Sequence, residues 1–171
     1  MLGHVRSIVT NDVIKTLNYN LIYPCLVYCC IIWGGAAGTT LNRLIVLQNR
    51  AVRLMTLSPY RTSAGPIYKQ LKLLQFNNIR KLQISVFMFK SKNKLLLKSC
   101  LQYCPINLNQ PYEMRITHHF VVPQYRTNAR EQCISAVGPR FWDSLPLDLM
   151  NLASLWMFKS EAQKYFFEKC Q

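Results

Sequence analysis

A long stretch without charged side chains, residues 16–42, limits the folds that this chain can adopt. Its central part, residues 21–37, is mostly apolar and nearly as long as a membrane-spanning helix. Pro24, Gly34 and Gly35 interrupt it, and asparagines and tyrosines dilute it, which suits hydrocarbon poorly. The stretch therefore favours buried helices. A small single-span membrane protein built on residues 21–37 is the alternative.

Helical periodicity is clearest in residues 41–55, where apolar side chains recur at three- and four-residue spacing. Thr39 or Thr40 is expected to cap this helix. The same spacing predicts a helix after Asn77 or Asn78 whose core side is formed by Ile79, Leu82, Val86 and Phe89. Further helices are expected over residues 13–22, where Pro24 should end or kink the helix, and over residues 26–33, 66–74 and 155–166.

The pattern changes beyond a polar, proline-broken stretch that begins near Lys92. Residues 115–122 and 132–137 are rich in β-branched and aromatic side chains, which predicts two short strands. Gly138 and Pro139 are typical of a turn. The predicted fold is mainly α, with a helical bundle (residues 1–92), a linker (93–114) and a small α+β segment (115–171). That segment is expected to hold a short antiparallel β-hairpin and a final helix.

Charge indicates the class of partner. Twenty-one Lys and Arg against seven Asp and Glu give a net charge of +14, spread along the chain. A folded protein this basic repels itself unless an anion lies against it, and a nucleic-acid backbone is the usual one. A solvated basic surface is the alternative. Seven cysteines, an odd number, and an opening segment without a continuous apolar run favour a reduced intracellular compartment, nuclear or cytoplasmic.

The sequence gives no sign of an active site. The carboxylates that two-metal catalysis needs are scattered: Asp12, Glu113, Glu131, Asp143, Asp148, Glu161 and Glu168. Cys100 and Cys104, with His118 and His119 downstream, lack the spacing of a zinc site. We therefore expect no catalytic residue, no metal and no cofactor, and hence no enzyme activity.

Arginines on the helix over residues 41–55 suggest a binding surface. Arg43 and Arg50 are about 20° apart around the helix axis, and Arg53 is one turn from Arg50. Guanidinium groups in such a row can meet successive phosphates, with Gln48 and Asn49 as neutral donors. A solubilising helix face is the alternative. Further predicted contacts are Arg61, Arg126 and Arg130, and Tyr125 can stack on a base or pack in a core.

Several short motifs resemble one family in their order. The first motif consists of Ile22, Pro24, Leu26, Tyr28, Trp33 and Gly34. The second consists of Leu47, Gln48, Asn49, Ala51 and Arg53, and the third of Tyr60, Arg61 and residues 71–74. Downstream come Arg126, Thr127, Gly138, Pro139, Trp142, residues 144–146 and Ser154, Phe158 and Lys159. The series resembles the region C-terminal to the polymerase core in reverse transcriptases of non-LTR retrotransposons, the jockey-like group in particular. Asp143 replaces the family's usual asparagine, and residues 112–115 depart from its Y-N-T-R element.

The resemblance implies a thumb-like helical region followed by a C-terminal segment that grips a template–primer duplex or target DNA. The catalytic palm is absent, so the chain is expected to be a truncated fragment of an RNA-directed DNA polymerase that is inactive alone. The missing polymerase core would be a partner in the parent protein. A decayed remnant without a biochemical role is the other alternative.

Overall fold

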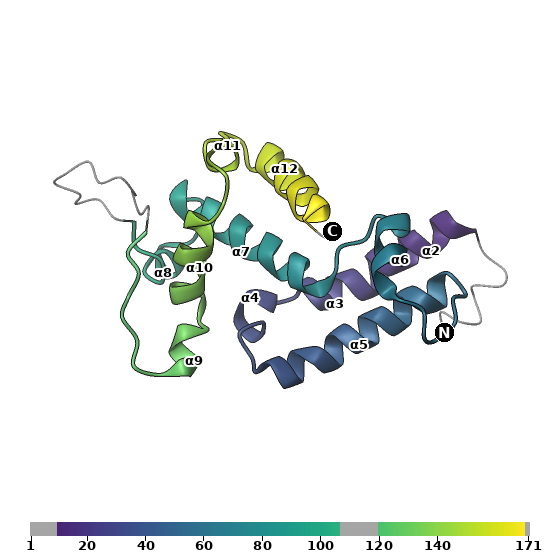
Figure 1. Cartoon of the computed structure of the whole chain (residues 1–171). Helices are drawn as coiled ribbons and strands as arrows, with labels where there is room; N and C mark the ends of the chain where they lie inside the picture. Colours follow the sequence, from purple (N-terminus) through teal and green to yellow (C-terminus); the bar gives the residue numbers. More distant parts are fainter. Residues whose placement is uncertain (1–9, 107–119, 170–171) are drawn as a thin grey trace.

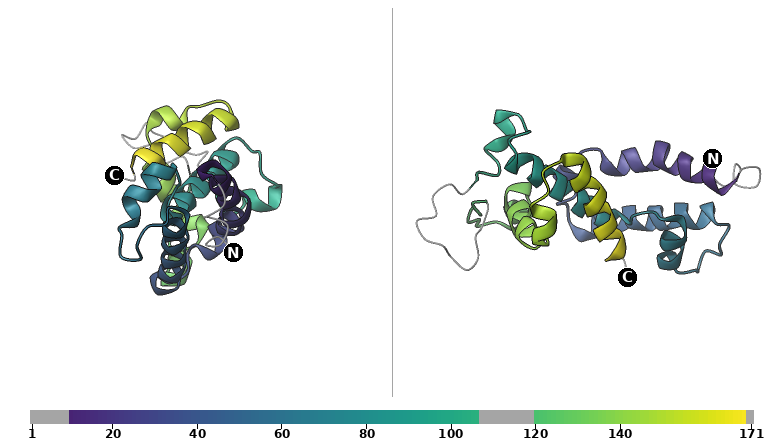
Figure 2. Two further views of the ribbon diagram at one scale, coloured as in Figure 1. Left: turned by 90° about the vertical axis from the view of Figure 1, so that its right-hand side faces the viewer. Right: turned by 90° about the horizontal axis from the view of Figure 1, so that it is seen from above.

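The computed structural model describes residues 10–106 and 120–169, and regular structure in these ranges is helical (Figure 1). The molecule is elongated, with α2 and α6 toward one end and α8 and α9 toward the other (Figures 1 and 2). Helix α7 (Phe76–Lys92) lies between the two ends, and α3, α4, α10 and α12 all pack against it. The prediction of a mainly α-helical protein is confirmed.

The uncharged stretch forms α2 (Asn11–Leu17), the π-helical turn η1 (Asn18–Ile22), α3 (Tyr23–Val27) and α4 (Cys30–Trp33). Of the predicted kink or break at Pro24, the break does not occur, because the wider π turn immediately before the proline lets the helix continue past it. The chain turns instead after Tyr28, where Cys29 is left-handed at φ 50°. The expected single helix over residues 26–33 is therefore two short ones. No helix in the described part of the chain is both long and apolar enough to cross a bilayer.

The middle of the chain forms α5 (Gly38–Met55) and α6 (Ala64–Leu71) before α7. Helix α5 confirms the predicted helix over residues 41–55, but it begins at Gly38, so Thr39 and Thr40 lie inside it instead of capping it. Helix α7 confirms its predicted core face, since Ile79, Leu82, Val86 and Phe89 are all buried.

The C-terminal part contains α8 (Lys98–Leu101), α9 (Asn128–Glu131), α10 (Ile134–Asp143), α11 (Leu147–Met150) and α12 (Leu155–Glu168). The predicted strand over residues 132–137 is wrong, because α10 begins at Ile134 and buries its apolar side against α7. Most of the other predicted strand, residues 115–119, lies outside the described residues. Within residues 10–106 and 120–169, β pairing is limited to an isolated antiparallel bridge between Ile106 and Phe120.

Gly138 and Pro139 do not form the predicted turn, since both are buried inside α10. A Cβ atom at Gly138 would lie 2.6 Å from Sδ of Met88 in α7. A larger residue at this position would therefore force the Met88 side chain to move, so glycine suits the close contact of α10 with α7. Its neighbour Trp142 is fully buried in the same contact region.

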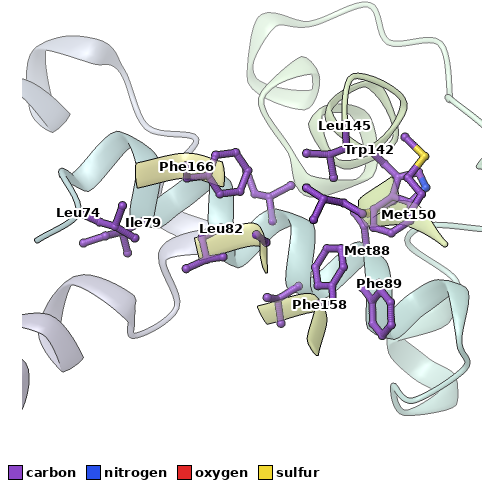
Figure 3. Packing of buried hydrophobic residues seen from close by; sticks show 14 of the residues in the cluster. Leu74, Ile79, Leu82, Met88, Phe89, Trp142, Leu145, Met150, Phe158 and Phe166 are labelled. Atoms are coloured by element: carbon purple, nitrogen blue, oxygen red, sulfur yellow. The ribbon is translucent and has the colours of Figure 1, made fainter. Parts of the chain in front are cut away.

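One large hydrophobic cluster, here the aromatic cluster, surrounds α7 and joins it to α10, α11 and α12 (Figure 3). Phe158 stacks on Phe89 with ring centroids 4.4 Å apart and lies 6.0 Å from the ring of Trp142. Members of this cluster come from both the predicted bundle, residues 1–92, and the predicted C-terminal segment, residues 115–171. The predicted linker contains α8, and its residues 107–114 lie outside the described part.

A second cluster, here the aliphatic cluster, lies where α2, α5 and α6 meet. It is formed by Ile14, Val52, Met55, Ala64, Ile67, Tyr68, Leu71 and Leu73. Gln48 connects the two clusters, because its Nε2 donates to the Leu74 carbonyl (3.1 Å) and its Oε1 accepts from the Phe76 N–H (2.8 Å). Trp33 stacks on the ring of Phe76, 5.3 Å between centroids, so the first three sequence motifs meet at the start of α7.

Candidate nucleic-acid interface

Helix α5 presents Arg43 and Arg50 to solvent on one side. Seven residues of helix place them about 10 Å apart along the axis and about 20° apart around it. No Asp or Glu occurs in α5. The ion pairs among the described residues, Lys15–Asp12, Arg140–Glu131 and Lys164–Glu161, involve neither arginine. These two guanidinium groups are therefore open to an external anion.

Arg53 is more constrained than the sequence suggested. Its side chain is half-buried, and its Nε donates to the Thr62 carbonyl at 2.7 Å. Its Cζ lies 5.9 Å from the ring centroid of Tyr60. Arg53 therefore holds the loop between α5 and α6, while the guanidinium group keeps further N–H donors. Arg61, in the same loop, is exposed.

Gln48 and Asn49 do not serve as the expected surface donors. Gln48 is buried, and both ends of its amide bond backbone groups between α6 and α7. Asn49 is half-buried, and its Oδ1 accepts from the Tyr68 hydroxyl at 3.0 Å. One signal was present in the sequence: Gln48 precedes Val52 and Met55 at four- and seven-residue spacing, which places it on the core side of α5. We leave Gln48 out of the proposed surface.

A polar groove of about 290 Å³ lies beside Arg53, where α6 and α7 begin. Neither helix has an acidic residue in its first turn or a hydrogen bond from its own N-cap side chain. The first N–H of α7, at Phe76, is bonded to Gln48 Oε1, so α6 has the more open N-terminus of the two. Backbone N–H groups at helix starts carry partial positive charge. The lining residues are Ile45, Asn49, Arg53, Ser63, Ala64, Gly65, Gln75, Phe76 and Asn77. The groove thus combines the Arg53 guanidinium group with the positive N-terminal end of α6, beside the start of α7. Sequence reasoning missed this arrangement because it joins three separate elements.

Arg126 and Arg130 are exposed at the other end of α5 from Arg61. Gly35, in the turn that precedes α5, lies so close to Gln132 that a Cβ atom there would be 2.6 Å from the Gln132 carbonyl oxygen. Helix α9 is therefore next to the N-terminal end of α5, as Figure 1 also shows. The predicted arginines do not form one compact patch. They extend along α5, a length of about 27 Å for its 18 residues.

Metal-binding side chains are not grouped in the described ranges, where no three His, Cys, Asp or Glu residues could together hold an ion. Comparison with protein-family models, with curated proteins and with solved structures gives no match. The resemblance to non-LTR reverse transcriptases thus stays a prediction from the sequence motifs.

Proposed function

We propose that this chain binds nucleic acid through the phosphate backbone, without sequence preference, as the helical region that follows the polymerase core in a non-LTR reverse transcriptase. The observation that carries the proposal is the pair of exposed, unneutralised arginines on α5, Arg43 and Arg50, in a chain of net charge +14. The proposal assigns no catalytic residue, metal or cofactor to the chain, and places it inside the cell, in the nucleus or cytoplasm.

The geometry favours a duplex over a small anion as the partner. The arginines are spread over the length of α5, so an extended polyanion, an RNA–DNA or DNA duplex, can contact several of them at once. Arg43, Arg50 and Arg61 would meet phosphates directly. Arg53 and the polar groove beside it would seat a further phosphate, and Asn49 would line that seat.

The test is the salt dependence of duplex binding. Fluorescence anisotropy with a labelled duplex should show affinity that falls steeply as salt rises. Substitution of Arg43, Arg50 and Arg61 by Gln should lower the slope of log K against log salt by about three, because each lost phosphate contact contributes about 0.9. A wild-type slope near zero would rule the proposal out.

A charge-matched control separates a surface from bulk charge. Lys94, Lys98 and Lys159 are exposed on elements outside α5 and its loops. Their substitution by Gln removes the same three charges, so a slope change equal to that of the arginine variant would show that the position of the charges does not matter. We expect the lysine variant to keep most of the wild-type slope.

The exposed apolar side chains of α5 favour a second candidate. Leu47 and Leu54 are 64% and 42% exposed and lie about 20° apart around the helix, next to the arginine row. Such residues are suited to burial against a further protein surface, which in a parent reverse transcriptase would be the polymerase core. This candidate predicts self-association of the isolated chain, measurable by light scattering, and no preference for duplex beyond that of other basic proteins.

A further inference from the structure

A cavity at the other end of the molecule from the aliphatic cluster carries a second site. It has a volume of about 380 Å³, within the range of about 300–1,000 Å³ typical of ligand sites. It lies between α4, α9 and the start of α10. Its lining residues are Ile31, Ile32, Tyr103, Tyr125, Arg130, Cys133, Ile134 and Ser135.

The walls of this cavity are mainly apolar and include two aromatic rings. Ile32 is 79% exposed and Tyr103 is 55% exposed, so both remain accessible to a ligand. The ring of Tyr125 is held in place, because its hydroxyl donates to Oγ of Ser135 at 2.8 Å. The cavity is thus an open slot with one fixed aromatic ring, one accessible aromatic ring and aliphatic side chains around them.

Its rim carries positive charge. Arg130 lines the cavity and is exposed, and Arg126 is exposed just before the same helix, α9. The acidic residue of this helix, Glu131, is already paired with Arg140 at 2.9 Å. A ligand that fits both features has a flat, largely apolar ring attached to an anion.

We propose that this slot takes an unpaired nucleobase whose adjoining phosphate lies against Arg130. Stacking on tyrosine is tolerant of base identity, because every base has a π face. A base inside a duplex presents no free face, so the slot requires a single-stranded segment. This inference rests on the proposed function and adds to it a base-contacting site for a single strand that is separate from the arginines of α5.

The test compares two single-stranded oligonucleotides of equal length and charge, a labelled oligothymidylate and one made entirely of abasic residues. The wild-type chain should bind the oligothymidylate about tenfold more tightly, because one stacked base contributes roughly 1–3 kcal/mol and 1.4 kcal/mol is tenfold. Tyr103→Ala should remove most of this preference. Trp156→Ala is the matched control, since Trp156 is 77% exposed on α12 and does not line the slot.

A chemical readout reports the slot directly in the wild-type chain. Cys133 lines the slot and is exposed, whereas Cys25 is exposed on α3 and does not line it. Oligothymidylate should slow the alkylation of Cys133 by iodoacetamide and leave that of Cys25 unchanged. The abasic oligonucleotide should protect neither residue.

Other outcomes would overturn the base site alone or both proposals together. Equal, salt-dependent affinity for both oligonucleotides, or equal protection of Cys133 by both, would overturn the base site and leave phosphate binding intact. A preference that survives Tyr103→Ala but disappears in Trp156→Ala would place base contact elsewhere and also overturn it. An absence of salt-dependent binding to any oligonucleotide or duplex would overturn the proposed function, and the base site with it.

Discussion

The two hydrophobic clusters of this protein are built in different ways. The aromatic cluster around α7 gathers rings from distant parts of the sequence, among them Phe89, Phe120, Trp142 and Phe158. The aliphatic cluster joins α2, α5 and α6 through smaller side chains and one tyrosine, Tyr68. Stacked rings bury more area per residue than aliphatic side chains do, and their pairing is directional. The aromatic cluster is therefore expected to dominate the free energy of unfolding.

The same difference bears on function. Beside the aliphatic cluster, α5 carries the exposed row Arg43, Leu47, Arg50 and Leu54, which the fold leaves uncovered. Around α7, by contrast, the faces of α10 and α12 are used for packing. This contrast agrees with the proposal that the exposed row of α5 is the main binding surface, held on the more tightly packed aromatic cluster.

The largest expected effect is that of Phe158→Ala. Phe158 is fully buried between Phe89 and Trp142, so its truncation removes two ring contacts and leaves a cavity. Substitutions of this kind cost about 3–5 kcal/mol. Equilibrium urea unfolding of the variant and the wild type measures the change in the free energy of unfolding.

Met55→Ala in the aliphatic cluster is the matched comparison. Met55 is also buried, but its cluster has fewer members and lies at one end of the molecule, so the surroundings can collapse more readily. A loss of about 2 kcal/mol, the low end for this type of substitution, is expected. Equal losses in the two variants would show that the clusters do not differ in rigidity.

Gln48→Ala tests the connection between the clusters. The substitution leaves the Phe76 N–H and the Leu74 carbonyl without their partner in a buried place, which costs about 2 kcal/mol. The loss is measured by the same urea unfolding. Gln70→Ala on the exposed side of α6 is the control and should stay within about 0.5 kcal/mol of wild type. If the two variants unfold alike, Gln48 does not link the clusters energetically.

The sequence predicted Gln48 on the binding surface, but the fold buries it, and other elements show the same limit of sequence reasoning. Local periodicity predicted one core face of α7, Ile79, Leu82, Val86 and Phe89. It did not predict that Ser85, Met88 and Ser91 are buried too, because α3, α4, α10 and α12 together cover more than one face of this helix. The contact of Gly138 with Met88 depends on a residue 50 positions away, and no local pattern distinguishes such a glycine from one in a turn. The β-branched residues near Ile134 suggested a strand by local preference, but packing on α7 made them helical. The polar groove needed three elements in space, so only the fold could reveal it.

A smaller effect is expected from pH. Burial raises the pKa of the Cys104 thiol, a member of the aromatic cluster, from 9.0 to about 11. The folded state therefore holds this proton more tightly than the unfolded state. The contribution of the protonated Cys104 thiol to the free energy of unfolding is fully present below about pH 9, the unfolded pKa. It is lost as the pH rises from there through the folded pKa near 11.

Ionisation of Cys104 in the unfolded state should lower the free energy of unfolding by about 1 kcal/mol by pH 10. Burial also raises the pKa of Cys30 to about 11, so the wild-type decline includes both thiols. Urea unfolding at pH 8 and pH 10 should show a smaller decline for Cys104→Ala than for the wild type. Cys133→Ala, at an exposed position outside the aromatic cluster, is the control for the loss of a thiol. Identical declines in all three proteins would remove Cys104 from the account.

The smallest effect on stability is expected where the function is proposed. Leu47→Gln with Leu54→Gln replaces two exposed side chains of α5, so the free energy of unfolding should change by less than about 0.5 kcal/mol at each position. If these leucines serve only as a docking surface for another protein, the double variant should reduce self-association in light scattering and leave duplex affinity unchanged. If instead the double variant unfolds more easily by several kcal/mol, α5 is covered in solution by part of the chain itself. The contrast between a rigid aromatic cluster and an uncovered α5 would then be wrong, because the α5 end would be as fully packed as the rest.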